Sequence, residues 1–112
     1  MELQMIDLGT ASKITLQGRL DTPGVDKIET RFTASIVPPG KPALVDLSGV
    51  TFVSSMGIRM LIGTARSLNL KHAKMIIFGA QPLVKESLDH VSLAEVIPVV
   101  ATEAQALELL KV

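Results

Sequence analysis

The sequence predicts an α/β protein with a mixed sheet, and three observations lead to this prediction. Short apolar or alternating segments recur between segments of helical periodicity, which is the pattern of strands joined by crossover helices. Two alternating segments at the start are separated by a glycine-containing connection, which indicates a hairpin and one antiparallel pair. Apolar residues make up 47% of the 112 residues, enough for a core. We expect one domain over residues 1–112, with four to five strands and about four helices packed mainly on one face.

The first half of the chain predicts the hairpin and one helix. Alternation over 3–8 and 13–17 gives the two strands, and the segment from Gly18 to Pro23 breaks the pattern. A helix from about Pro23 to Ile36 follows, capped by Asp21 or Thr22. Its buried positions are spaced by three or four residues: Val25, Ile28, Phe32 and Ile36.

The second half predicts three further strands and three further helices. Residues 43–47 and 74–78 are short apolar runs typical of buried strands, and 49–53 is expected to be a connection. A helix begins near Ser54 or Ser55 and ends near residue 70, and a shorter helix covers 82–89. Residues 96–99 predict an edge strand because Pro98 cannot donate to a ladder. A capping box then opens the last helix. The buried stripe expected on the helix that follows the serines is Ile58, Leu61, Ile62, Ala65 and Leu68.

Composition excludes several classes of function. Lys plus Arg and Asp plus Glu are both 11, so the chain lacks the net positive charge on which nucleic-acid binding depends. There are no cysteines, no apolar run approaches the ~18 residues of a membrane span, and the acidic start is unlike a signal peptide. The chain contains no P-loop and no nucleophile elbow. His72 and His90 are expected at the edge of the sheet far from the serines, so we predict neither catalytic residues nor a metal site.

The predicted order of elements draws attention to the start of the second long helix. Loops at 18–22, 49–55 and 79–81 follow strands and lead into helix N-termini, where N–H groups and the helix dipole favour negative charge. The segment Ser54-Ser55-Met56-Gly57 lies at one such N-terminus. Serines cap helices in any case, so capping is the simpler interpretation of this pair, with Gly57 giving steric access to the second serine.

The segment from Val45 to Leu61, VDLSGVTFVSSMGIRML, resembles the central motif of STAS domains, and Gly18-Arg19-Leu20-Asp21 is similar to the family's element after the second strand. The resemblance covers essentially the whole chain. In anti-sigma factor antagonists of this family, the serine that matches Ser55 is phosphorylated by an anti-sigma factor that is also a kinase. Asp21 matches an aspartate near the acceptor and Asp46 a polar strand-end position. Ser54 and Met56 depart from the commoner Asp and Ser or Ala, which keeps Ser54 open as an alternative acceptor.

The same helix offers a face for a partner. Met56, Met60, Gly63 and Ser67 lie opposite the predicted buried stripe, and exposed methionines re-pack readily against a partner. The alternative is that both methionines fill gaps in the core. The full set of expected partner-binding residues is Gly18, Arg19, Leu20, Thr22, Met56, Arg59, Met60 and Gly63.

The resemblance implies a binding protein rather than an enzyme. Unphosphorylated, it would sequester an anti-sigma factor with serine kinase activity and so free a sigma factor. We expect a cytoplasmic protein without cofactors, nucleic-acid partners, membrane insertion or a required small-molecule ligand. The alternative within the family is a subunit or scaffold, in a lipid-transport ABC complex or a stress-sensing complex, that binds its partner without phosphorylation.

Overall fold

In the computed structural model, which describes residues 1–110, five strands form one sheet in the order β1-β2-β3-β4-β5. β1 (Glu2–Asp7) pairs antiparallel with β2 (Ser12–Leu20). The remaining strands are parallel to β2; they are β3 (Ala43–Val53), β4 (Met75–Phe78) and β5 (Val99–Val100). The predicted α/β class and mixed sheet are therefore confirmed, and residues 111 and 112 of the predicted domain lie outside the described residues.

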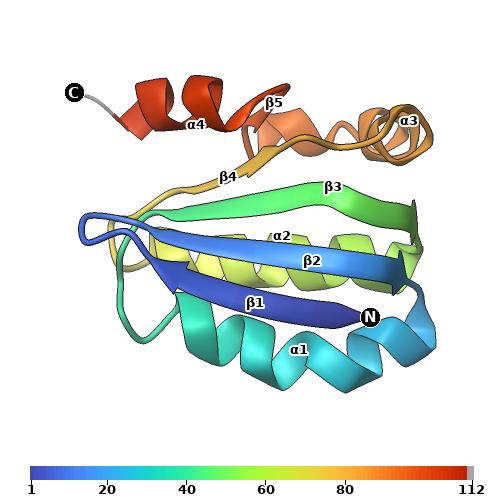
Figure 1. Cartoon of the computed structure of the whole chain (residues 1–112), viewed down its shortest axis with the longest axis horizontal. Helices are drawn as coiled ribbons and strands as arrows, with labels where there is room; N and C mark the ends of the chain where they lie inside the picture. The colour runs from blue at the N-terminus through green and yellow to red at the C-terminus, as the bar shows by residue number, and fades with distance from the viewer. Residues whose placement is uncertain (111–112) are drawn as a thin grey trace.

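The helices lie mainly on one face of this sheet, as predicted. α1 (Thr22–Ile36), α2 (Ser55–Asn69) and α3 (Pro82–His90) each connect two consecutive parallel strands. Because such crossovers are right-handed, a strand order that always increases puts them on the same face. Figure 1 shows α1 below the strands, α2 behind β2, and α4 (Glu103–Leu110) at the top beside β5.

Two clusters of buried side chains lie on the two faces of the sheet. In the main cluster, the four apolar positions predicted for α1 are all buried, with Phe32 fully enclosed between α1 and the sheet. The smaller cluster lies under α4, where Ala106 packs against Leu44, Ile76 and Phe78. The predicted capping box of α4 is confirmed, since Gln105 N–H donates to Thr102 Oγ1 at 3.2 Å and Thr102 N–H to Gln105 Oε1 at 3.2 Å.

β2 and β3 are longer than predicted, and the reason is a pair of irregularities in their ladder. We expected Gly18 to end one strand and Gly49 to begin a connection, but β2 continues to Leu20 and β3 to Val53. The register shifts between Thr15 and Gln17 and again after Gly18, which has φ +111°. Such bulges interrupt the alternation of buried and exposed side chains without ending the strand. For this reason the sequence analysis assigned residues 18–20 and 49–53 to loops.

The last strand was also misplaced. Val96 and Ile97 belong to the turn that follows a short 3₁₀ helix (Leu93–Glu95), and β5 begins at Val99. The expectation of an edge position is confirmed, since β5 pairs with β4 alone. Pro98 contributes its carbonyl, which accepts a hydrogen bond from Ile77 N–H at 2.9 Å.

Candidate functional site

The N-termini of α1 and α2 lie side by side because the strands that precede them are neighbours. Leu20 is paired with Val53 at the carboxyl ends of β2 and β3, and each strand passes within two residues into its helix. The extension of both strands places these turns at one end of the sheet, on the right in Figure 1. This end is the candidate functional site.

Ser54 is the N-cap of α2 and its hydroxyl is already occupied. Its Oγ accepts a hydrogen bond from Gly57 N–H at 3.2 Å and donates to the Leu20 carbonyl at 3.1 Å. Ser54 N–H also donates to that carbonyl, at 2.9 Å. These hydrogen bonds link the start of α2 to the end of β2. Ser54 is therefore the capping serine of the pair.

Ser55 is the first residue of α2 and is exposed. The free N–H groups and the dipole of a helix stabilise negative charge at this position. A phosphate there would be stabilised within the domain, while about −1.5 to −2 charges would appear on the surface. The geometry therefore suits Ser55 as a phosphate acceptor better than Ser54.

Asp21 is the N-cap of α1, and it is one of the two residues that the sequence predicted for this role. Its Oδ1 accepts a hydrogen bond from Gly24 N–H at 2.9 Å, and its Oδ2 lies 3.3 Å from Arg19 Nε. The bond from Gly24, and after it the Arg19 guanidinium, lower the pKa of the Asp21 carboxyl. Because Ser54 binds the carbonyl of Leu20, the residue before Asp21, this carboxylate belongs to the same end of the molecule as Ser55.

Asp46 does not lie at the end of the molecule that carries Ser55. The sequence suggested a strand-end position, but Asp46 is the fourth residue of β3, paired with Thr15 and Phe78. Val53 lies seven positions further along the strand, roughly 23 Å away at the usual rise. The Oδ1 of Asp46 accepts a hydrogen bond from Ser48 N–H at 2.9 Å, within β3 where the register with β2 shifts.

The residues predicted from the 18–22 segment have different environments. Leu20 is fully buried in the core and is unavailable to a partner, and Gly18 is half-buried beside the backbone of Met1. Arg19 is exposed, and its guanidinium stacks 4.5 Å from the centre of the Phe52 ring. Thr22, the first residue of α1, is exposed. This segment therefore offers two of its four predicted residues, Arg19 and Thr22, as exposed residues.

Gly57 has a packing role instead of the predicted role in access. It is buried, and a Cβ at this position would lie 2.8 Å from the Leu20 carbonyl oxygen and 3.0 Å from Val53 Cγ2. The contact with the carbonyl oxygen is shorter than a real Cβ makes, so the glycine allows α2 to approach the ends of β2 and β3 closely.

The exposed face of α2 differs from the predicted one because the helix is rotated. Met60 is 3% exposed and belongs to the core, so its prediction as a partner contact was wrong and the gap-filling alternative holds. Met56, Arg59 and Gly63 are exposed as predicted. Ile58 and Ile62, expected in the buried stripe, are half-buried. The buried positions are Gly57, Met60, Leu61, Thr64, Ala65 and Leu68.

Several residues at this end were not predicted from the sequence. Val91, just after α3, lines a shallow groove with Ser55 and residues of α2, and Phe52 lines another groove with Leu83 of α3. Phe52, Leu83 and Val91 are all substantially exposed, and their apolar side chains lie at the same end of the molecule as Ser55. The sequence did contain one sign of these residues: Phe52, Leu83 and Val91 are apolar, yet none of them belongs to a predicted buried stripe.

The placement of His90 also corrects the sequence analysis. We expected both histidines far from Ser55, but His90 lines a groove with Val53, so it lies at the same end as the serine. Its Nε2 faces Glu86 Oε1 at 3.9 Å, on its own helix. Since no hydrogen bond joins His90 to Ser55 within residues 1–110, the structure contains no serine–histidine pair of the kind that nucleophilic catalysis needs.

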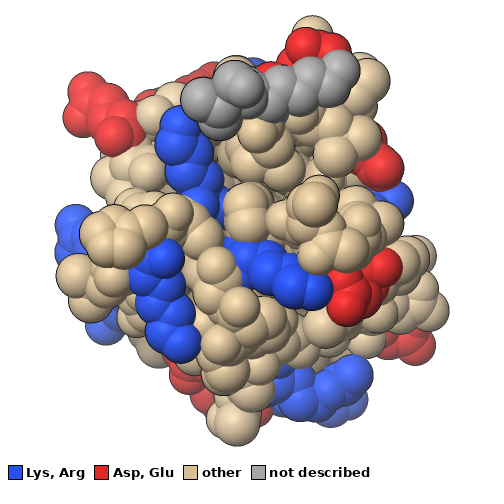
Figure 2. All heavy atoms as spheres, turned by 90° about the vertical axis from the view of Figure 1, so that its left-hand side faces the viewer, with Lys and Arg blue, Asp and Glu red and all other residues tan. Residues whose placement is uncertain are grey.

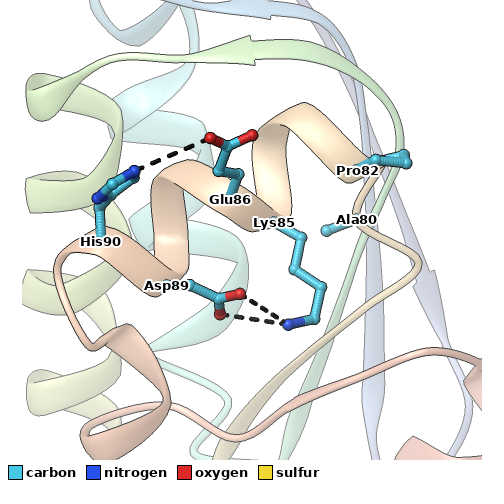
Figure 3. Close-up of a pocket in the computed structure, with 6 residues that line it drawn as sticks. All are labelled: Ala80, Pro82, Lys85, Glu86, Asp89 and His90. Atoms are coloured by element: carbon cyan, nitrogen blue, oxygen red, sulfur yellow. Dashed lines mark hydrogen bonds and ion pairs between the residues drawn. The ribbon is translucent and has the colours of Figure 1, made fainter.

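Figure 3 shows the hollow beside α3, where charged side chains pair along the helix. Lys85 Nζ lies 3.0 Å from Asp89 Oδ2, and Glu86 pairs with His90. Both pairs join residues four apart, and at this spacing the Lys85–Asp89 ion pair stabilises an exposed helix by a few tenths of a kcal/mol. The charged side chains in this hollow therefore pair with one another along α3, and they do not surround a common point where a ligand would bind.

The remaining surface supports few other classes of site. Figure 2 views the end opposite Ser55, where Lys and Arg side chains lie in separate groups among uncharged residues. Among residues 1–110 no three His, Asp or Glu side chains gather as metal ligands, and no helix is long and apolar enough to cross a membrane.

Comparisons with known proteins identify the family and the fold. The family model of the STAS domain matches residues 3–106. An anti-sigma factor antagonist from Mycobacterium paratuberculosis has 20% identity and a TM-score of 0.88, over 99% of this chain and 94% of that chain. The Bacillus cell fate determinant SpoIIAA in the phosphorylated form has 20% identity and a TM-score of 0.72, over 98% and 100%. Part of the murine Slc26a9 anion transporter has 17% identity and a TM-score of 0.79, over 93% of this chain and 18% of that chain. At these identities the similarities to solved structures establish a common fold.

Proposed function

The chain belongs to the STAS domain family, and we propose that it is an anti-sigma factor antagonist switched by phosphorylation of Ser55. Unphosphorylated, it binds an anti-sigma factor that is also a serine kinase, and a sigma factor is thereby released to direct transcription. Phosphate transferred to Ser55 by that partner ends the association. One observation carries this proposal: the Ser55 hydroxyl is exposed at the first position of α2, while the neighbouring Ser54 hydroxyl is engaged in two hydrogen bonds.

The surroundings of Ser55 support a binding role. Exposed apolar side chains at Phe52, Met56 and Val91 provide area that a partner can bury. Charge added at Ser55 would lie among them, and an uncompensated charge desolvated at an interface costs several kcal/mol. We further propose that the protein acts in the cytoplasm, without catalytic activity or a cofactor of its own.

The first experiment asks where the phosphate goes. The purified chain is incubated with ATP and each kinase-type anti-sigma factor encoded near its gene, and phosphopeptides are mapped by mass spectrometry. We expect one phosphate on Ser55, retained in Ser54→Ala and lost in Ser55→Ala. Phosphate on Ser54 alone would show that the acceptor is displaced by one residue. If no kinase modifies the chain, the switch is refuted, and partner binding without phosphorylation, as a subunit of a transport or stress-sensing complex, becomes the better explanation.

The second experiment measures binding by titration calorimetry. Ser55→Asp is expected to weaken association with the anti-sigma factor by about tenfold or more, because each 1.4 kcal/mol of lost interaction is tenfold in affinity. Ser55→Ala is the matched control and is expected to bind like the wild type. The true phosphoprotein is titrated beside Ser55→Asp, and wild-type affinity of the phosphoprotein would refute the switch.

A further inference from the structure

One stripe of α2 joins Ser55 to two arginines. Ser55, Arg59, Ile62 and Arg66 follow one another at spacings of four, three and four residues, which puts them on one face of the helix. With Ile58 and Val91 they line a shallow groove of about 420 Å³. The groove therefore combines apolar walls with two cations, and it begins at the proposed acceptor.

Both arginines of the stripe are exposed and unpaired. Neither Arg59 nor Arg66 forms an ion pair or a side-chain hydrogen bond with any residue among 1–110. Arg19, by contrast, is held by Asp21 and Phe52. Two free guanidinium groups about 10 Å apart along the helix, with Ile62 between them, complement an apolar segment that carries carboxylates.

Arg59 is also placed to meet a phosphate on Ser55. An acidic group at position i and a basic group at i+4 form the favourable orientation of a helical pair. Side chains on a helix lean toward its N-terminus, which favours approach of the Arg59 guanidinium to Ser55 across the groove that both residues line. Other ionisable groups at this end include the Asp21 carboxylate, already bonded to Arg19, the amino group of Met1 beside Gly18, and Glu86 with His90.

We infer that Arg59 is the group through which the switch acts: it binds a carboxylate of the partner when Ser55 is free and is captured by the phosphate when Ser55 is modified. The partner segment that docks on the stripe is apolar and acidic, with carboxylates facing Arg59 and Arg66. This inference rests on the proposed function, which it extends to the chemistry of the partner surface. Phosphorylation then removes an attractive contact as well as adding a repulsive charge.

The deciding experiment needs neither kinase nor partner. Phosphoserine is placed at position 55 by peptide ligation, and the second pKa of its phosphate is measured by ³¹P NMR titration in the wild type, Arg59→Gln and Arg66→Gln. A nearby cation favours the dianion and lowers this pKa, so Arg59→Gln is expected to raise it by about 0.3 pH unit or more. Arg66→Gln removes the same charge three turns from the phosphate and is the matched control, expected to leave the pKa unchanged. Equal pKa values in all three proteins, or equal rises in both variants, would overturn the capture of Arg59.

A binding measurement then tests the partner chemistry with the kinase that modifies Ser55. Arg59→Gln and Arg66→Gln are each expected to weaken binding of the unphosphorylated chain by about threefold or more, since a well-placed exposed pair contributes up to ~1 kcal/mol. Phosphorylation is expected to weaken binding by a smaller factor in Arg59→Gln than in the wild type. Unchanged affinity in both variants would refute an acidic partner segment. If no kinase modifies Ser55, the proposed function fails, while the titration still decides whether Arg59 holds the phosphate.

Discussion

The close approach of α2 to the sheet at Gly57 leads to a sharp prediction about stability. In Gly57→Ala, the new Cβ would lie 2.8 Å from both Leu20 Cγ and the Leu20 carbonyl oxygen, and 3.0 Å from Val53 Cγ2. That carbonyl accepts two hydrogen bonds from Ser54, so it cannot move without disturbing the cap of α2. Overpacking of this kind costs about 1–3 kcal/mol, and the backbone contact places the cost at about 2. The better helix propensity of alanine returns about 1 kcal/mol, so we expect a net loss of about 1 kcal/mol.

Gly63→Ala is the matched control for this prediction. Gly63 lies in the same helix, is exposed, and has nothing within 4 Å of the position of a Cβ. The substitution should therefore stabilise the domain by up to about 1 kcal/mol. The two variants make the same chemical change with opposite expected signs, and they should differ by about 2 kcal/mol.

The assay is urea unfolding followed by far-ultraviolet circular dichroism, because the chain contains no tryptophan and no tyrosine. At this size a difference of 2 kcal/mol also separates the two midpoints of thermal unfolding by about 8 °C. Wild-type stability or better in Gly57→Ala would refute the argument that a glycine is needed for contact between α2 and the carboxyl ends of β2 and β3.

Three further predictions concern individual side chains. Ser54→Ala should lower the free energy of unfolding by about 0.5–2 kcal/mol, measured by urea unfolding, because it removes the N-cap of α2; a cost no larger than that of Ser55→Ala would contradict this role. Met60→Ala should cost about 2–5 kcal/mol and Met56→Ala less than about 0.5, and similar costs would show that the orientation of α2 is wrong. The pKa of Asp21 is lowered in the folded state, so its contribution is present above its usual value of 3.8 and is lost as pH falls through the folded pKa. Asp21→Asn should therefore flatten the loss of stability below about pH 4 in acid melts, and an unchanged slope would show that the charge of Asp21 does not contribute to stability.

The site illustrates what a local pattern predicts well. The positions of Ser54 and Ser55 at the start of a helix follow from neighbouring residues alone, because capping involves atoms within a few residues of one another. The choice between the two serines as acceptor does not. It depends on the Leu20 carbonyl, 34 residues away in the chain, which occupies the hydroxyl of Ser54.

The sequence by itself determined the order of strands and helices, the buried face of α1 and the capping box of α4. Each of these depends on a period or a spacing within one segment, and Val25, Ile28, Phe32 and Ile36 reveal theirs directly. Tertiary structure decided which way α2 faces. The helix rests on Gly57, and the buried stripe counted from that residue includes Met60 and Thr64, whereas a wheel weighted by hydrophobicity favours Ile58 and Ile62. Tertiary structure also placed Asp46 far from Ser55 and Val91 beside Ser55. Both distances depend on strand length, register and the direction of the crossovers. Such quantities depend on contacts between segments far apart in the chain, and no local pattern contains them.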